Sequence, residues 1–366
     1  MPSQRSLYPD VDSPGLVLDK DRLERNLRAM QAACDAHGVE LWPHIKTHKM
    51  VPVLRRQLEL GARGITCAKL GEAEAMLPSG VRRVFLAHSL ADHSKIGRLR
   101  WLADQLDELL LAVTSLAHCE VLESLLESFS LPVPVLMAVD TGLGREGTRN
   151  PGQSVELAAR IRRSPRMTLA GLYTHEGHAY DASNSEEVEN RAIAIHRTLS
   201  AHAAAIGAPP LPFWPGCSVT ALRMVGRPGV RAVRPGSYVF GDLLLSEETK
   251  VASFEDNALS VLATVVDRPE SGLALIDAGS KMFGSDKTSS GLMARCLELP
   301  RLVVRRVSEE HGFLSGKGVD DLALGDRLRF IPAHICPVVN LASQVAVVQG
   351  ERLVDRWPVD ARGRTG

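Results

Sequence analysis

The run Pro43-His44-Ile45-Lys46-Thr47-His48-Lys49 holds the side chains with the clearest chemical potential. A lysine amine kept near apolar walls loses part of its preference for the ammonium form and becomes able to condense with an aldehyde. Residues 39–42, directly before the run, are typical of a short strand. The pattern therefore places Lys46 at the carboxyl end of a strand and predicts a lysine that carries pyridoxal phosphate (PLP).

A second chemical pair, His334 and Cys336, lies far from Lys46 in the sequence. In a strand or extended loop, residues two apart point to the same side, so this imidazole and this thiolate can bind one ion, although strands often contain both residue types for packing alone. Two protein ligands leave positions open for water or a substrate oxygen, on which the ion acts as a Lewis acid. Because a thiolate is a soft ligand, zinc is the first prediction, with manganese or magnesium as alternatives.

Two loops rich in glycine and hydroxyl groups are candidates for binding an anion. Residues 216–220 read Gly-Cys-Ser-Val-Thr, and residues 236–238 read Gly-Ser-Tyr. Small residues, exposed backbone N–H groups and hydroxyls suit a phosphate at the amino ends of helices. Glycine-serine loops are also ordinary turns, so the loops by themselves leave both interpretations open.

The elements that must position these groups are short apolar runs that alternate with helical patterns. The runs cover residues 39–42, 64–67, 84–87, 110–113, 135–139, 169–173, 211–214 and 230–233. This alternation predicts an α/β fold with a (β/α)8 TIM barrel, in which chemistry is placed at the carboxyl ends of the strands. The polar residues that follow the predicted strands include Lys46, His88, Asp140, Arg145, His175 and His178.

After about Phe240 the pattern changes to strands and turns without long helices. The predicted strands are residues 259–266, 273–277, 302–307, 327–331 and 344–348. We therefore predict a barrel over residues 16–245 and an appended C-terminal β domain over residues 246–366. Residues 279–293, which are rich in serine and glycine, are predicted to form a long mobile loop that suits an active-site wall.

The composition indicates which kinds of partner and which cellular location to expect. The 366 residues include 43 Lys plus Arg and 43 Asp plus Glu, so no global field attracts nucleic acid or an anionic membrane, and a small-molecule substrate is expected. No run reaches the roughly 20 apolar residues of a membrane helix, and the first residues lack a secretory signal, which predicts a cytoplasmic protein. The six cysteines show no paired spacing, so a disulfide framework is not expected.

Three segments in order carry a resemblance to a known family. They are LVLDKDRLERN at residues 16–26, PHIKTHK at 43–49 and GITCAKLGEAE at 64–74. Together they resemble the family of D-threonine aldolase and D-serine dehydratase, fold type III PLP enzymes related to alanine racemase. The likeness extends from about residue 16 to residue 363. It implies an alanine racemase-like barrel with a β domain, a D-amino acid substrate and a homodimer, and it assigns the cofactor to Lys46 rather than to Lys49.

The same resemblance implies roles for further residues. It places the cofactor phosphate in the two glycine-rich loops, with Ser218, Thr220, Gly236, Ser237 and Tyr238 as its binding residues. Residues 139–147 resemble the family segment whose arginine approaches the PLP ring oxygen, which nominates Arg145, with a surface ion pair to Glu146 or Asp140 as the alternative. Residues 174–180 fall where relatives face the ring with aromatic and imidazole groups, which nominates His175 first and then His178 and Tyr180.

The expected function is a PLP- and metal-dependent lyase acting on D-3-hydroxy amino acids. Two outcomes stay open: β-elimination, in which Lys46 removes the Cα proton, and retro-aldol cleavage, in which a metal-activated base removes the β-hydroxyl proton. At the position of His334 and Cys336, the dehydratases of the family that this chain resembles carry His-x-Cys and the aldolases tend to carry His-x-Asp, so Cys336 favours elimination. An amino-acid racemase, which needs an acid or base on each face of the ring and no metal, is one alternative. A non-catalytic PLP carrier, which usually lacks the β domain, is another.

Overall fold

The structure is a computed structural model that describes residues 7–366. These residues form two compact units. The first, called the β unit here, contains the residues up to Arg28 together with Thr47–Met50 and Ser237–Gly363; the second, the barrel unit, contains Ala29–Lys46, Val51–Gly236 and Arg364–Gly366. None of the helices in the described part of the chain has the length and hydropathy needed to cross a membrane.

The barrel unit is built on a ring of parallel strands. They are β2 (Glu40–Leu41), β3 (Ile65–Cys67), β4 (Arg83–Leu86), β5 (Glu108–Val113), β6 (Val133–Ala138), β7 (Met167–Thr174), β8 (Phe213–Pro215) and β9 (Ala232–Val233). Strands β3 to β8 form a six-stranded sheet in sequence order, and β2 pairs with β9. The bridges His44↔Thr66 and Phe213↔Val230 join β2 to β3 and β8 to β9, so the ring closes. The predicted (β/α)8 barrel is confirmed.

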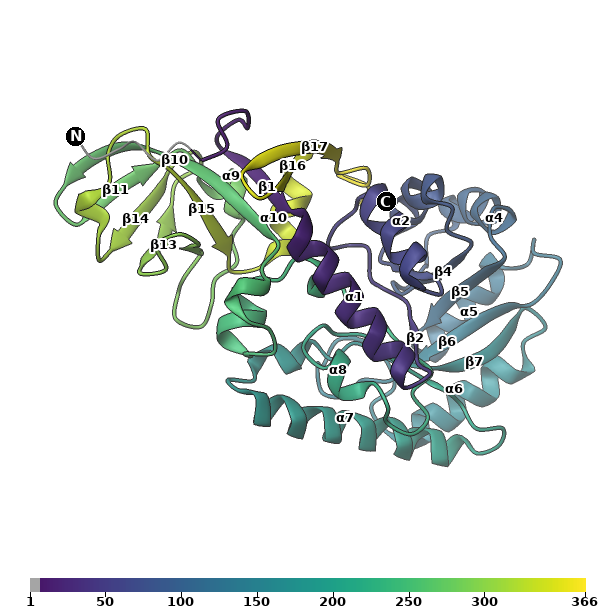
Figure 1. Cartoon of the computed structure of the whole chain (residues 1–366). Helices are drawn as coiled ribbons and strands as arrows, with labels where there is room; N and C mark the ends of the chain where they lie inside the picture. Colours follow the sequence, from purple (N-terminus) through teal and green to yellow (C-terminus); the bar gives the residue numbers. More distant parts are fainter. Residues whose placement is uncertain (1–6) are drawn as a thin grey trace. The chain divides into compact units, whose positions relative to one another are not determined.

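Helices connect these strands, and several appear around the sheet in Figure 1. They are α2 (Val51–Leu60), α3 (Leu70–Met76), α4 (Ile96–Asp104), α5 (Leu116–Leu125), α6 (Pro151–Arg163), α7 (Ser185–Ile206) and the single turn α8 (Ala221–Met224), while α1 (Lys20–Ala36) begins in one unit and ends in the other. Local chemistry sets their starts. Asn150 caps α6 by accepting the Gln153 N–H, and Pro151 occupies the first turn, where its missing N–H costs nothing.

Large side chains fill the inside of the barrel. The buried cluster contains Trp42, Phe85, Leu110, Ala112, Leu136, Ala138, Tyr173, Trp214 and Ala232. The rings of Trp42 and Trp214 meet edge to face with centroids 4.9 Å apart, and Phe85 meets Tyr173 in the same way at 5.2 Å. Because the interior is packed, chemistry is left to the rim, where loops follow the strands.

The β unit contains a nine-stranded sheet. Its strands are β1 (Gly15–Asp19), β10 (Leu259–Glu270), β11 (Leu273–Ile276), β12 (Ala294–Cys296), β13 (Leu302–Val307), β14 (Gly312–Gly316), β15 (Arg327–Pro332), β16 (Gln344–Gln349) and β17 (Arg352–Pro358). Strand β10 pairs with both β11 and β15, so six of them close an antiparallel barrel in the order β10-β11-β14-β13-β12-β15. The five predicted strands are confirmed, whereas the sequence pattern does not predict β1, β12, β14 and β17.

Two predictions about local structure in the β unit need correction. Residues 279–293 are not a loop throughout, because the short helix α9 (Ser280–Phe283) occupies their start. His334 and Cys336 do not lie on an extended segment: His334 is the N-cap of α10 (Ile335–Leu341), and Cys336 is in its first turn. Pro337 sits within that turn, where a residue without an N–H is tolerated.

Candidate active site

A cavity of about 370 Å³ lies at the carboxyl ends of the barrel strands. It is lined by His44, Lys46, Ala68, Ala87, His88, Arg145, Glu146, Tyr173, His175, Gly216 and Arg234. Lys46 follows β2, Arg145 follows β6 and His175 follows β7. The structure therefore brings three predicted residues together from distant parts of the sequence. The volume falls in the range of about 300–1,000 Å³ that is usual for small-molecule sites.

His175 is held in one tautomer by the backbone. Its Nδ1 lies 2.7 Å from the Gly216 carbonyl oxygen. Since a carbonyl only accepts, Nδ1 carries the proton and Nε2 is left with its lone pair. Burial, together with the positive charges of Lys46 and the arginines, lowers the pKa of His175 to about 3. The ring is neutral near pH 7 and offers a hydrogen-bond acceptor.

Glu176 and Arg234, which the sequence did not reveal as site residues, form a buried polar layer beneath this histidine. The Glu176 carboxylate accepts the Gly216 N–H at 3.1–3.2 Å, so residues 175 and 176 hold both backbone groups of Gly216. Burial raises the pKa of Glu176 to about 7, although Arg234 opposes this. Arg234 donates to the carbonyls of Thr174 and Trp214 at 2.6 and 3.0 Å.

Gly216 is the residue that this packing requires. A Cβ placed there would lie 2.4 Å from Nη2 of Arg234, closer than any real Cβ contact. No side chain therefore fits at this position, and the backbone itself forms the cavity wall.

Arg145 lies at the cavity and also forms the surface ion pair that was the alternative to a cofactor role. It lines the cavity, and its guanidinium also pairs with Glu146 at 3.1 Å, while its side chain is 56% exposed. The bend that carries it is made by Gly142, Gly144 and Gly147, all with positive φ. Asp140 supports the turn by accepting the N–H groups of Gly142 and Gly144.

The predicted phosphate loops do not line the cavity beyond Gly216. Ser218 Oγ accepts the Gly236 N–H at 3.0 Å, so this N–H is already engaged, and the Ser218 hydroxyl proton is left to donate. Thr220 is buried at the N-cap of α8. Ser237 and Tyr238 belong to the β unit, in η4 (Ser237–Val239).

Other predicted residues have local roles. His88 lines the cavity, and its Nε2 lies 3.2 Å from the Lys69 amine. His178 and Tyr180 lie in η3 (Gly177–Asp181) and do not line it. The His178 carbonyl accepts a hydrogen bond from Arg191, and burial lowers the pKa of the His178 ring.

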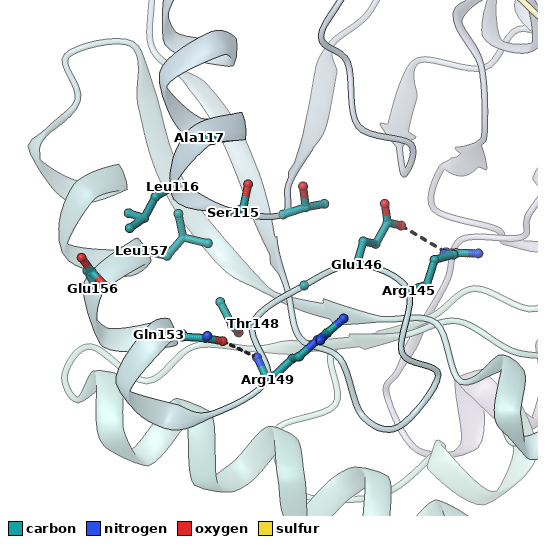
Figure 2. A pocket seen from close by; sticks show the side chains of 12 residues that line it. Ser115, Leu116, Ala117, Arg145, Glu146, Thr148, Arg149, Gln153, Glu156 and Leu157 are labelled. Atoms are coloured by element: carbon teal, nitrogen blue, oxygen red, sulfur yellow. Dashed lines mark hydrogen bonds and ion pairs between the residues drawn. The ribbon is translucent and has the colours of Figure 1, made fainter.

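A larger cavity of about 630 Å³ adjoins Arg145 and Glu146. Figure 2 shows these two residues on one side and Leu116 and Leu157 on the other. Arg145 is the only predicted site residue among its lining residues. We therefore place the candidate active site at the smaller cavity, which contains Lys46.

In the β unit, His334 and Cys336 contact each other at the start of α10. Burial alone lowers the pKa of His334, but the hydrogen bond with Cys336 and the carboxylates of Asp242 and Asp286 raise it to about 10. Metal binding needs a neutral imidazole, so an ion bound here would displace that proton. Among residues 7–366, no group of three or more His, Cys, Asp or Glu side chains is arranged to hold a metal, which leaves two ligands at most from these residue types here.

Asp286 and Asp242 fix this histidine from two directions. Asp286 Oδ2 lies 2.7 Å from Nδ1 of His334, which leaves Nε2 for an ion, as in the carboxylate–histidine arrangement of many metal sites. Asp242, fully buried, accepts the N–H groups of Ile335 and Leu245 and so anchors the start of α10. Thr47, the residue after Lys46 in the sequence, places its Oγ1 3.1 Å from Cys336 Sγ.

The chain matches two known families. The family described as "Alanine racemase, N-terminal domain" matches residues 18–243, and the one described as "Putative serine dehydratase domain" matches residues 258–348. The chain is similar to D-threonine aldolase from Arthrobacter sp., with 30% identity over 359 residues, 96% of this chain and 93% of that protein. It is also similar to D-threo-3-hydroxyaspartate dehydratase from Delftia sp., with 33% identity over 352 residues, 89% of this chain and 91% of that protein.

Solved structures agree in fold. The crystal structure of D-threonine aldolase from Filomicrobium marinum superposes with a TM-score of 0.91 at 28% identity and covers 100% of both chains. A structure of D-threo-3-hydroxyaspartate dehydratase with a histidine replaced by alanine superposes with a TM-score of 0.88 at 29% identity and covers 97% of this chain and 96% of that one. A metal-free structure with a cysteine replaced by alanine superposes with a TM-score of 0.87 at 30% identity and covers 97% of this chain and 99% of that one.

Proposed function

Because this chain belongs to the alanine racemase N-terminal domain family, with a serine dehydratase domain after it, we propose that it is a PLP- and metal-dependent lyase acting on D-3-hydroxy amino acids. The observation that carries the proposal is the cavity shared by Lys46, Arg145 and His175. An amine, a neutral imidazole and a guanidinium around about 370 Å³ form a donor set that fits PLP. Relatives named as aldolase and dehydratase for such substrates support the lyase class.

The residues that would hold PLP follow from this donor set. Lys46 is proposed to bind its aldehyde, Arg145 its ring oxygen, and His175 its ring face. The hydroxyls of Ser218, Thr220, Ser237 and Tyr238 and the Gly236 backbone are proposed to bind the phosphate. When bound, PLP supplies an electron sink for charge that develops at the substrate's Cα.

Lys46 and His175 are the groups of the protein that are candidates for transfer of the substrate's Cα proton. With PLP bound, the Lys46 amine would be the base that takes the Cα proton in a β-elimination. His175 does not serve as the acid near pH 7, because its pKa is about 3 and its ring is neutral there. Its Nε2 accepts a hydrogen bond instead, while Glu176 and the Gly216 backbone keep the ring from turning.

His334 and Cys336 are proposed as the metal ligands. An ion held there would supply Lewis-acid chemistry for the substrate's β-oxygen. The imidazole and thiol fit zinc better than magnesium or manganese. Thr47 follows Lys46 in the sequence, and its hydroxyl contacts the sulfur of Cys336.

The choice between elimination and retro-aldol cleavage is tested by product analysis. The protein supplied with PLP and zinc or manganese is incubated with D-threonine, D-serine and D-threo-3-hydroxyaspartate. A keto acid with ammonia indicates dehydration, and glycine with an aldehyde indicates aldol cleavage. Formation of the L-enantiomers alone would identify a racemase, and no conversion would favour a PLP carrier.

We further propose that residues 16–245 carry the PLP site and residues 246–366 the metal site, a division supported by the family matches at 18–243 and 258–348. A homodimer and a cytoplasmic location remain predictions from the sequence. Light scattering of the purified protein tests the homodimer, whose expected mass is twice 39.7 kDa.

A further inference from the structure

A third cavity, of about 380 Å³, lies beside the Lys46 cavity on the barrel rim. Its wall carries the basic residues Lys69, His88 and Lys95 and one carboxylate, Asp92. Lys69 follows β3 and His88 follows β4, so both stand where barrel enzymes keep functional residues. Ala68 and His88 line both cavities, and the two spaces therefore adjoin through these residues.

The contact between Lys69 and His88 fixes the charge of each. The His88 Nδ1 lies 3.0 Å from the Ser89 carbonyl oxygen, and its Nε2 lies 3.2 Å from the Lys69 amine. The carbonyl only accepts, and an ammonium only donates, so His88 is the neutral Nδ1–H tautomer and accepts from Lys69. Lys69 thus keeps its positive charge, is oriented by a neutral partner, and has donors left for a ligand.

The nearby carboxylates accept backbone N–H groups or pair with an arginine. Glu72 accepts the Ala68 N–H at 2.7 Å, Asp92 accepts the Ser94 N–H at 2.9 Å, and Glu146 pairs with Arg145 at 3.1 Å. Within residues 7–366, the hydrogen-bond partner of the Lys69 amine is His88. The cavity wall carries two lysines and one carboxylate, Asp92, so its net charge is positive and favours an anionic group of a ligand.

We propose that Lys69, oriented by His88, binds the side-chain carboxylate of the substrate, so that the enzyme prefers dicarboxylic D-3-hydroxy amino acids such as D-threo-3-hydroxyaspartate. This inference rests on the proposed function, because it places the substrate's amino end in the Lys46 cavity and its far end toward Lys69. A carboxylate on Cβ gains a charge-assisted hydrogen bond there. The methyl group of D-threonine gains nothing, and its approach would partly desolvate an ammonium.

Two substrates make a matched test. D-threo-3-hydroxyaspartate and D-threonine share the amine, the α-carboxylate and the β-hydroxyl, and they differ in the remaining group on Cβ. We expect Lys69→Met to lower kcat/KM for the dicarboxylate about 10- to 100-fold, the usual effect of losing a hydrogen bond to a charged group, with less than about a threefold change for D-threonine. Lys69→Arg, which keeps the charge, is expected to retain more of the preference than Lys69→Met. Lys317→Met, at an exposed lysine of the β unit, serves as the control.

Binding of unreactive analogues gives a second readout that does not depend on turnover. D-malate and D-lactate differ by one carboxylate, and their dissociation constants are measured on the holoenzyme by calorimetric titration. The wild-type protein should bind D-malate more tightly, and Lys69→Met should bind both about equally.

The outcomes separate this inference from the function it rests on. If the wild-type holoenzyme converts none of the three D-3-hydroxy amino acids, the proposed function is wrong. If its kcat/KM for D-threonine or D-serine equals that for the dicarboxylate, or if Lys69→Met lowers kcat/KM for D-threo-3-hydroxyaspartate and D-threonine equally, only the role of Lys69 is overturned.

Discussion

At the scale of single residues, the two lysines of the basic motif differ in what their amines contact. The Lys49 amine is buried and donates to Asn340 Oδ1 at 2.8 Å, whereas Lys46 lines the cavity. We therefore expect Lys46→Ala to remove the visible absorbance of the purified holoprotein, because no other amine replaces it as the partner of the aldehyde. Lys49→Ala should keep that absorbance. A Lys46→Ala protein that stays yellow with bound cofactor would refute the assignment.

Glu176 should make the stability of the protein depend on pH. Its pKa in the folded protein is about 7, above the ordinary 4.5, so the folded state holds a proton that the unfolded state has released between these values. The stability contribution of this proton is full below the unfolded pKa and is lost as pH rises through about 7. Glu176→Gln cannot ionise. Its free energy of unfolding, relative to wild type, should therefore rise between about pH 5 and pH 8.

Urea denaturation at several pH values measures this difference. A matched control is Glu123→Gln, because Glu123 pairs with Arg160 and its pKa is lowered instead. The relative stability of the control is expected to fall, not rise, as the pH increases through the range in which Glu123 ionises. Parallel pH profiles for wild type and Glu176→Gln would contradict the burial of an ionisable carboxyl here.

Residue-scale prediction from sequence depends on motifs that indicate the chemistry. The motifs around Lys46, Arg145 and His175 predict all three as site residues, and all three line one cavity. Sequence reasoning misses Glu176 and Arg234 because their importance comes from burial around Gly216, and sequence spacing carries no signal of that contact. A weak clue exists, since Glu176 directly follows His175.

At the scale of elements, the loop after β6 depends on glycine for two separable reasons. A Cβ at Gly147, where φ is +106°, would lie 2.8 Å from the Asp140 nitrogen. At Gly144, where φ is +75°, a Cβ would meet nothing within 4 Å. We expect Gly144→Ala to cost about 1–2 kcal/mol from the positive φ alone. Gly147→Ala should cost clearly more, because the clash adds to that strain.

Thermal or urea unfolding of the two variants checks this difference. Gly147→Ala should also weaken PLP binding, since the same loop carries Arg145, and Gly144→Ala should weaken it less. Equal destabilisation by the two variants would show that the clash is relieved by a small backbone shift.

The segment after α9 matters because it carries Asp286 to His334. A carboxylate on the outer nitrogen of a ligating histidine typically contributes about 10- to 100-fold to metal affinity. Asp286→Asn should therefore lower zinc affinity by about that factor, while PLP absorbance stays unchanged. Zinc titration of the chelator-treated wild-type and Asp286→Asn proteins measures the two affinities. Activity that survives verified removal of all metal would exclude His334 and Cys336 as a catalytic metal site.

Helices and strands are predicted well where apolar residues recur along the sequence in a regular pattern. The apolar runs locate all eight barrel strands, even β8, which Pro212 precedes and Pro215 ends. The pair His334 and Cys336 is expected on an extended segment and instead begins a helix. The two side chains still meet, because the cap residue and the first turn of α10 are adjacent. Strands β1, β12, β14 and β17 escape prediction because pairing in the β unit, and not a strong local pattern, defines them.

At the scale of the whole molecule, the segments proposed to carry the PLP site (16–245) and the metal site (246–366) do not coincide with units that fold separately. Strand β1 pairs with β10 and β16, both beyond residue 245. Its residues Leu16, Val17 and Leu18 are 3%, 1% and 0% exposed. In a fragment of residues 16–245, these three side chains would become exposed to solvent, which would lower the free energy of unfolding by about 2 kcal/mol each. Both edges of β1 would also be unpaired and available to strands of other chains.

We therefore expect the fragment 16–245 to aggregate when it is expressed alone, although it contains every strand of the barrel. Co-expression with residues 246–366 should restore soluble protein, because β10 and β16 then pair with β1 as in the intact chain. A variant fragment that begins at Ala29 lacks β1 and should be less prone to aggregate than 16–245, which separates the effect of the uncovered strand from the loss of the β unit. Size-exclusion chromatography of the three preparations measures the outcome. A fragment 16–245 that is monomeric and unfolds cooperatively by itself would show that the barrel folds without the strands that cover β1, and that the boundary in the sequence is also a boundary in folding.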